Sequence, residues 1–520
     1  MIHEEPSSVL CQNHFGLPSQ RTSVQSLPTE LLLIIFTHLY RRLSSGFNRY
    51  GRMSTQSIEV SESGSSLPEF DPTLFPYALS SVCVAWRDTM ALVPEFWTHL
   101  LVIVNLNASK RHYMYQYRGC RFTSKFELFA HLAWSRNLPL KVHVVTRYPT
   151  TPGVDEQHAT RILENRCITD IMQILAPHIH RCCALRFQVI YSSSLPILRQ
   201  HLQRSTWPTR LKELILDCSV ADYDSFDAEN TTIHEWHPCP SLHTLHLDGR
   251  SFRDICSTSK AHNSWLTYLP CLHVLTISHS RIPISIAEFF RVLSSRTSPS
   301  IWTLKVQDVE FYKDNDDAGS ALYEFGFSPE LIDLKSSSLC CFFRALAESP
   351  TQVTLTRCSF ASIGIIKASE LFLREIIAEE DMDLANALTP WQGHTLNIHS
   401  CPAFNDVFLR RMNPEESHLD EIYNHRPFPA CQFWALEISD CRSFSISALQ
   451  ALVRARREAA VEEAGYELVD GLRAWNMTYV RLERVRPIVS IVIMGRAPEI
   501  TMDEMKWFED NVAYFYWSGN

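Results

Sequence analysis

Five side chains that could bind a metal ion lie within a short stretch of the sequence. They are His234, His237, Cys239, His243 and His246. Imidazole and thiolate groups are the ligands that zinc prefers, usually in tetrahedral geometry. The segment around His243 has the apolar alternation of a β-strand, in which successive side chains point to opposite faces. His243 and His246 would then lie on opposite faces, so we expect no metal site and no cofactor.

Motifs that mark catalytic sites are missing from the chain. It contains no G-x-S-x-G, no phosphate-binding loop, no G-x-G-x-x-G and no H-E-x-x-H. It has only 15 glycines in 520 residues, so loops that cradle a phosphate are not expected. We predict that the protein is not an enzyme and has no catalytic residues. An enzyme remains an alternative only through the histidine cluster.

Composition and charge are ordinary for a globular protein and argue against some classes of partner. Hydrophobic residues make up 45% and charged residues 20%, and the formal net charge is −9. This acidic balance argues against binding nucleic acid, whose partners carry basic patches. The first 25 residues are polar and no segment has the ~18 apolar residues that span a membrane. We therefore expect no membrane partner, a cytoplasmic or nuclear location, and reduced thiols for the 16 cysteines.

The segment "SLPTELLLIIFTHLY", residues 26–40, predicts a helix over residues 27–39. Pro28 suits the first helical position, and Glu30 suits the positive end of the helix dipole. One set of apolar residues recurs at helical spacing: Leu27, Leu31, Ile34, Ile35 and Leu39. A second set lies elsewhere on the helix: Leu32, Leu33 and Phe36. A helix that is apolar on more than one side is buried all round or needs a partner.

The next segment, residues 41–73, is rich in Ser, Gly and charge, and we expect a flexible insertion there. Helical periodicity resumes after it and predicts a second amphipathic helix. The residues that carry this period are Phe75, Ala78, Leu79, Val82, Cys83 and Trp86. A short third helix that stops at Pro94 and a strand over residues 100–104 complete the pattern.

This ordered set of helices resembles the F-box over residues 26 to about 100. The resemblance rests on Leu27-Pro28, Glu30 to Leu32, Ile34 to Phe36, His38-Leu39, Leu79, Val82-Cys83, Trp86-Arg87 and Pro94 to Trp97. The insertion of some thirty residues departs from the family pattern. An F-box implies docking on a Skp-type adaptor of a cullin–RING ubiquitin ligase. The adaptor-binding residues implied by the resemblance are Leu27, Pro28, Glu30, Leu31, Ile34, Ile35, Leu39, Val82, Cys83 and Trp86.

The remaining four hundred residues contain an imperfect repeat. Four segments share an apolar-x-x-apolar-x-apolar core: 211–219, 242–250, 272–280 and 301–309. Their third apolar residues are Leu216, Leu247, Ile277 and Val306, which are 31, 30 and 29 residues apart. Looser units at 353–360, 396–406 and 436–444 add Cys358, Cys401 and Cys441. Further strands are expected at 139–145, 185–190 and 487–495.

Helical segments lie between these strands, at 126–135, 168–182, 284–295, 339–349 and 445–464. Strand–helix alternation predicts an α/β fold with a parallel sheet and right-handed crossovers. The pattern resembles the cysteine-containing leucine-rich repeat, which implies an irregular solenoid with helices on its convex side. Insertions are expected at 221–240, 311–335 and 405–430, and the aromatic end of the chain is expected to cap the last repeat.

These patterns divide the chain into a disordered tail at 1–25, an F-box domain at 26–104, a connecting helical segment at 105–136 and a repeat domain at 137–520. Solenoids commonly bind proteins on their concave face. The strand residues predicted to line that face and contact a target are Glu213, Asp217, His246, Asp248, Lys305, Gln307, Asn397, His399 and Glu437.

The order of parts predicts the substrate-recognition subunit of a Skp–cullin–F-box ubiquitin ligase. The F-box would hold the Skp adaptor, and through it the cullin, while the repeat domain would hold an unidentified target protein. An F-box scaffold that binds proteins without ubiquitination is the alternative.

Overall fold

The computed structural model describes two compact units. The described residues are 27–50, 75–106, 125–147, 154–197, 209–222, 239–257, 265–294, 301–313, 327–361, 366–377, 383–413, 430, 432–464 and 485–519. The first unit contains the described residues up to Thr98 together with Ala130–Arg136, and the second unit contains the rest. The tail predicted at 1–25 lies outside the described residues.

The first unit begins with helix α1, Thr29–Tyr50, which is longer than the sequence predicts. The carbonyl of Pro28 accepts a hydrogen bond from the N–H of Leu32 at 3.2 Å, so Pro28 lies just before the helix rather than inside its first turn. The prediction that the insertion starts at residue 41 is wrong, because α1 continues to Tyr50. A single glycine costs a helix only about 1 kcal/mol, so Gly46 is not enough to end it. Residues 51–73 of the predicted insertion lie outside the described residues.

The prediction of a single helix over residues 75–86 is also wrong, because the chain turns between residues 80 and 84. Helix α2 spans Tyr77–Ser80 and helix α3 spans Val84–Ala91. Cys83 between them is fully extended, with φ −160° and ψ 167°, which no helical residue adopts. The predicted third helix is the second half of α3, which ends before Pro94. Pro94 instead opens the 3₁₀ turn η3, Pro94–Trp97.

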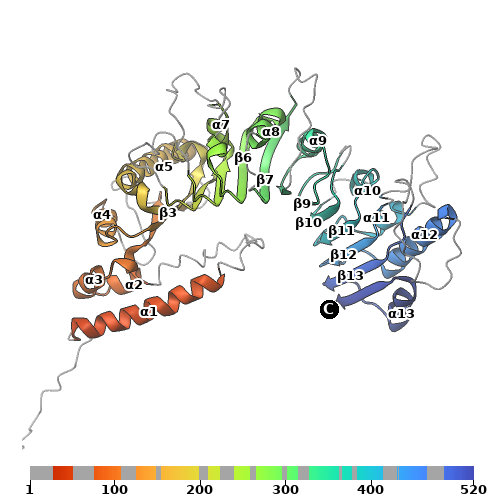
Figure 1. Cartoon of the computed structure of the whole chain (residues 1–520), viewed down its shortest axis with the longest axis horizontal. Helices are drawn as coiled ribbons and strands as arrows, with labels where there is room; N and C mark the ends of the chain where they lie inside the picture. Colours follow the sequence, from red (N-terminus) through yellow and green to blue (C-terminus); the bar gives the residue numbers. More distant parts are fainter. Residues whose placement is uncertain are drawn as a thin grey trace, which may run out of the picture. The chain divides into compact units, whose positions relative to one another are not determined.

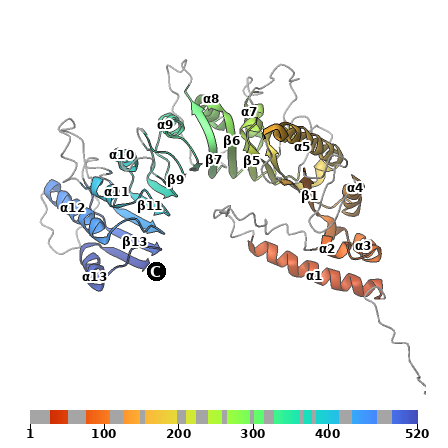
Figure 2. The same cartoon turned by 180° about the vertical axis from the view of Figure 1, so that it is seen from behind.

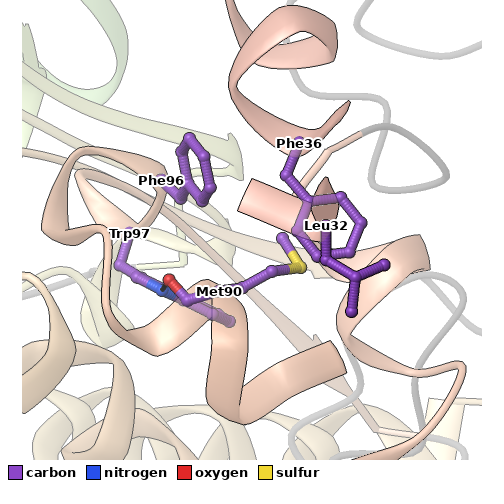
Figure 3. Close-up of a cluster of buried hydrophobic side chains, with 5 residues drawn as sticks. All are labelled: Leu32, Phe36, Met90, Phe96 and Trp97. Carbon is purple, nitrogen blue, oxygen red and sulfur yellow. Dashed lines mark hydrogen bonds between the residues drawn. The ribbon is translucent and has the colours of Figure 1, made fainter. Parts of the chain in front are cut away.

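The core of the first unit joins these elements. Figure 3 shows the buried side chains that meet there: Leu32 and Phe36 from α1, Met90 from α3, and Phe96 and Trp97 from η3. The indole N–H of Trp97 donates to the carbonyl of Met90 at 3.0 Å, so the polar atom of the largest core residue is satisfied. Fully burying each such apolar side chain stabilises the fold by about 1.5–3 kcal/mol. A few residues therefore hold the helices together.

The described residues of the second unit form one sheet of fourteen parallel strands, arranged in the order of the sequence. The strands are β1 His99–Asn105, β2 Leu140–Arg147, β3 Cys182–Tyr191, β4 Glu213–Val220, β5 Thr244–Asp248, β6 Val274–Ser285, β7 Thr303–Tyr312, β8 Ser328–Ile332, β9 Gln352–Thr356, β10 Glu370–Arg374, β11 Thr395–His399, β12 Ala435–Ser439, β13 Ser490–Gly495 and β14 Tyr514–Gly519. The α/β class and the parallel sheet predicted from the sequence are thus confirmed.

Helices connect most of these strands. They are α5 Val154–Leu175, α7 Gly249–Ser257, α8 Ile286–Ser294, α9 Ser336–Ala345, α10 Asp383–Leu388, α11 Asp406–Arg411, α12 Ile446–Ala464 and α13 Met502–Asn511, and α4, Lys125–Trp134, spans the boundary of the two units. Figures 1 and 2 show α5, α7, α8, α9, α10 and α12 on one side of the sheet. We call the other side the open face. Across the described part of the chain, no helix is both long and apolar enough to cross a membrane.

Three strands and several helices were not predicted. β8 lies in the insertion expected at 311–335 and contains Pro329, a residue that strands inside a sheet usually exclude. β10 was missed although Leu371 and Leu373 alternate, and β14 follows the strand that was expected to be the last. Helix α11 lies in the insertion expected at 405–430 and, like α10, is only six residues long, which is too short to show a helical period.

Stacked aliphatic side chains form the core of the second unit. The register aligns one residue from each successive strand: Leu247, Ile277, Val306, Leu331, Leu355, Leu373, Ile398, Ile438 and Ile493. All of these residues are buried. In β12, for example, the residues before and after the buried one are only half-buried, because successive side chains point to opposite faces. Each strand therefore depends mainly on the strands beside it, as in a solenoid.

The strands from β6 to β13 share an unusual backbone conformation just after their aligned core residues, inside β6 and β7 and at the carboxyl ends of the others. A residue with positive φ follows the aligned strand residues in each: His279, Asp308, Asp333, Arg357, Glu375, Ser400, Asp440 and Gly495. Several of these residues donate their N–H to a carbonyl of the next strand, for example Ser400 to Ser439 at 2.9 Å. Three predicted repeat cysteines come directly afterwards, and their thiols bond backbone carbonyls, as Cys401 does to Leu373 at 3.4 Å. Burial raises the pKa of Cys401 to about 12.

Candidate protein-binding surfaces

Helix α1 carries a second apolar stripe outside the core. Leu31 is 47%, Ile34 65% and Ile35 44% exposed, although they belong to a helix whose Leu32 and Phe36 are buried. Residues three and four apart share a helix face, so these three form one stripe next to the buried one. We call them the exposed stripe of α1. Three neighbouring exposed aliphatic side chains on one helix are typical of a surface that another protein covers.

The other residues predicted to bind an adaptor differ in how far they are exposed to solvent. Pro28 and Glu30 are exposed, and Val82 in the turn before α3 is 56% exposed. Four are half-buried: Leu27, Leu39, Cys83 and Trp86. Sequence reasoning did not select Val84 and Leu92 at the two ends of α3, which are also exposed.

Trp86 links the surface of the first unit to its core. Its ring contacts that of Phe36 edge-on, with the centroids 5.1 Å apart, in the arrangement that aromatic pairs prefer. Its indole nitrogen is buried and finds no hydrogen-bond acceptor among the described residues. Trp86 therefore supports α1 from beneath, which is a structural role distinct from that of the exposed stripe.

A buried histidine lies behind η3. The ring of His131 packs against those of Trp97 and Trp134, at centroid distances of 4.7 and 5.5 Å. Burial lowers the pKa of His131 to about 3, because the charged imidazolium would lose its hydration. His131 is therefore neutral at physiological pH and acts as a core residue.

The first half of the open face carries paired charges. Arg186 of β3 forms two hydrogen bonds with Glu213 of β4, one of them 3.0 Å between Nη2 and Oε2. Lys305 of β7 lies 3.4 Å from Glu330 of β8. Gln307 on the same face is half-buried. Glu213 and Lys305 thus have partners within the sheet, which reduces the charge that this half offers to a target.

One hydroxyl–imidazole pair on this face has the residue types of a catalytic site. His246 Nε2 lies 2.9 Å from Ser278 Oγ, and Asp217 Oδ1 lies 3.8 Å from the same nitrogen. In a Ser-His-Asp triad the acid binds the other ring nitrogen, and the serine must reach a substrate. Ser278 is completely buried, so the triad geometry is not met. Burial lowers the pKa of His246, which favours the neutral ring over a salt bridge with Asp217.

The prediction that Asp248 lines a target-binding face is wrong. Its side chain is fully buried and begins helix α7, accepting hydrogen bonds from the N–H of Ser251 at 3.0 Å and of Arg250 at 3.3 Å. This is the capping role that aspartate commonly has at the start of a helix. Burial raises the pKa of Asp248.

The second half of the open face holds the remaining predicted residues. Asn397 of β11 is buried, while His399 and Glu437 are half-buried. His399 Nδ1 lies 3.9 Å from Asp440 Oδ2. The missed strand β10 adds Phe372, which the register places directly beside Asn397.

The histidine cluster is only partly visible. His234 and His237 lie outside the described residues, so the absence of metal stays a prediction. The ring of His243 stacks on His273 at 5.4 Å, and that of His273 lies 5.4 Å from the ring of Trp302. Within the described ranges, no three His, Cys, Asp or Glu side chains are placed to share a metal ion.

Comparison with known proteins identified no relative of this chain among protein-family models or curated proteins.

Proposed function

We propose that this protein is the substrate-recognition subunit of a Skp–cullin–F-box ubiquitin ligase. In this proposal the first unit is an F-box that binds a Skp-type adaptor. The second unit is a leucine-rich-repeat-like solenoid that binds a target protein on its open face. The protein performs no chemistry itself. It raises the rate of ubiquitin transfer by holding the target near the charged ubiquitin carrier at high effective concentration.

The observation that carries the proposal is the exposed stripe of α1. Leu31, Ile34 and Ile35 belong to the motif by which the segment resembles an F-box, and they are exposed on a helix anchored by Leu32 and Phe36. Burying three aliphatic side chains on a partner supplies a few kcal/mol of binding free energy at about 1.5–3 kcal/mol each. The cytoplasm or nucleus, where cullin–RING ligases act, is the proposed location.

The arrangement of the second unit supports the other half of the proposal. Among the described residues, the consecutive strand–helix units leave the open face of the sheet without helices, and solenoids commonly use such faces to bind proteins. The cysteines that follow the strand ends at Cys358, Cys401 and Cys441 are buried and hydrogen-bonded to backbone. Such a position favours the cysteine-containing type of repeat.

Affinity purification of the full chain from cells tests the proposal. Recovery of both a Skp-type adaptor and a cullin is expected. Recovery of the adaptor without a cullin would instead favour a scaffold that binds proteins without ubiquitination. Recovery of neither would overturn the proposal.

A further inference from the structure

Three neighbouring strands bring an aromatic ring, an amide and a carboxylate together on the open face. The register pairs Phe372 of β10 with Asn397 of β11, and Asn397 with Glu437 of β12. Neighbouring strands are about 4.8 Å apart, so the backbones that carry Phe372 and Glu437 are separated by about 10 Å with Asn397 between them. A flat group about as thick as an aromatic ring fits that spacing above Asn397.

Asn397 is the floor of this arrangement. Leu396 and Ile398 on either side of it belong to the core, so strand alternation directs Asn397 to the open face. It is nevertheless only 8% exposed. Its amide oxygen Oδ1 is buried without a hydrogen-bond partner in the described residues. A buried acceptor left unsatisfied costs about 1–3 kcal/mol, so this oxygen favours a ligand that donates a hydrogen bond.

The charge beside Asn397 is negative. Glu437 is half-buried and has no ion pair among the described residues, and the same is true of Glu370 on β10. This differs from the first half of the face, where Glu213 is paired with Arg186 and Glu330 with Lys305. Arg374, the basic residue nearest on β10, already has interactions of its own. The two unpaired carboxylates therefore favour a cationic ligand.

We propose that Phe372, Asn397 and Glu437 bind the guanidinium group of an arginine side chain in the target protein. This inference rests on the proposed function of the second unit as a target-binding domain. The guanidinium plane stacks on the ring of Phe372, as cations do on aromatic faces. Its N–H groups donate to the Glu437 carboxylate and to Asn397 Oδ1. Arginine fits better than lysine because its donors form a planar fork that can reach both acceptors while the plane stacks.

Methyl NMR of the full chain with three short peptides tests this site. Val492 pairs in register with Glu437, so its methyl groups report binding there. The probes are acetyl-Gly-Arg-Gly-amide, its lysine analogue and its citrulline analogue, which has the shape of arginine without the charge. We expect saturable shifts of Val492 with the arginine peptide, at least threefold weaker binding of the lysine peptide, and at least tenfold weaker binding of the citrulline peptide. Equal binding of lysine, or no saturable shift with arginine, would overturn the inference.

Three variants assign the contacts. Glu437→Gln keeps the shape of the side chain and is expected to weaken binding of the arginine peptide at least tenfold. Its matched control, Glu458→Gln on the exposed side of α12, is expected to leave binding unchanged. Asn397→Leu is expected to weaken binding at least fivefold yet raise the melting temperature, since it removes an unsatisfied buried oxygen. Unchanged arginine binding in Glu437→Gln or Asn397→Leu would contradict the assignment.

The same preparations separate this inference from the proposed function. If the chain binds a Skp-type adaptor but not the arginine peptide, only the arginine site is overturned. If it binds the peptide but no adaptor, the proposed ligase function fails and the arginine site stands.

Discussion

In the described part of the chain, eight strands contain or directly precede a residue with left-handed backbone, and seven of these residues are not glycine. Such a conformation costs an L-residue roughly 1–2 kcal/mol. The cost is offset by the N–H groups that reach the next strand, and at Arg357 by hydrogen bonds to Asp333 at 2.7 and 2.9 Å and to Glu375 at 3.0 Å. Ser400 has the same backbone and no such ion pair, so its side chain contributes little in return.

Replacing Ser400 by glycine should therefore stabilise the second unit. We expect Ser400→Gly to raise the free energy of unfolding by about 0.5–1 kcal/mol, because glycine adopts positive φ without steric cost. The matched control is Ser439→Gly at the last residue of β12, where φ is not positive, and it should lower the free energy of unfolding by about 0.5–1 kcal/mol. Urea unfolding followed by circular dichroism measures both. A loss of stability in Ser400→Gly would contradict the assigned backbone.

His131 makes the first unit sensitive to acid. Its pKa is about 3 in the folded protein and near 6.5 when unfolded, so the unfolded chain binds the proton more readily at any pH between these values. The stability that the neutral His131 ring contributes is therefore fully present above about pH 6.5 and is lost as the pH falls toward 3. The loss should reach about 2 kcal/mol at pH 5.

Replacing this histidine by glutamine should remove that pH dependence. We expect His131→Gln to lose about 2 kcal/mol less than the wild type between pH 7 and pH 5, although its stability at pH 7 is lower because ring packing is lost. Urea unfolding followed by tryptophan fluorescence at the two pH values is the measurement. Equal pH dependence in the two proteins would show that His131 is not buried as a neutral ring.

For single residues, the sequence predicts which face of a strand a side chain lies on better than it predicts what the side chain binds. The strand pattern placed Glu213, His246 and Lys305 on the open face, but the same alternation misplaced Asp248, whose carboxylate turns back to cap α7. The signal was present, because aspartate followed by glycine at the end of a strand can begin a helix. The surroundings of Asn397 could not be predicted, since its register neighbour Phe372 lies on β10, a strand that the sequence pattern did not predict.

Helix α1 shows how one element serves two purposes. Its sequence is apolar on several sides, and periodicity alone could not decide which stripe faces the core. The structure places Leu32 and Phe36 inside and the exposed stripe outside, because Phe36 meets Trp86 and the other aromatic residues of the first unit. Tertiary packing therefore decides which stripe of α1 is core and which is surface, and the spacing of apolar residues alone does not determine this.

Alanine substitutions on α1 should separate the two stripes. Phe36→Ala should destabilise the first unit by about 3–5 kcal/mol, because it opens a cavity in the core. Ile34→Ala should change stability by no more than about 0.5 kcal/mol, as exposed sites usually do. Hydrogen exchange of the segment containing Trp97 reports the local stability. Comparable destabilisation by both variants would show that Ile34 is also a core residue.

Most strands that the sequence predicted have clear apolar alternation, and several of the elements that it did not predict have a specific physical reason. β8 contains Pro329, whose missing N–H normally excludes a central strand, and α10 and α11 are shorter than two helical turns. The break at Cys83 was hidden because the apolar spacing runs through it without interruption. Propensity and period describe long regular elements well but cannot locate turns that tertiary contacts impose.

At the scale of the whole molecule, the order of parts is the argument for function. A small helical unit with an exposed apolar stripe precedes a sheet of fourteen parallel strands in sequence order. The repeat spacing of about thirty residues predicted this parallel order, since each strand needs a crossover before the next. The target cannot be predicted in the same way, because recognition depends on side chains that each strand adds independently to the open face.

Binding of a purified Skp-type adaptor to the full chain tests the central claim most directly. The variant is Leu31→Asp/Ile34→Asp, which puts charge into the exposed stripe of α1. The matched control is Ile162→Asp/Ile377→Asp, which makes the same change at exposed isoleucines of the second unit. Biolayer interferometry should show that wild type and control bind equally and that the stripe variant binds at least a hundredfold more weakly. Equal binding by the stripe variant would contradict the proposed surface, and no binding by the wild type would contradict the proposed function.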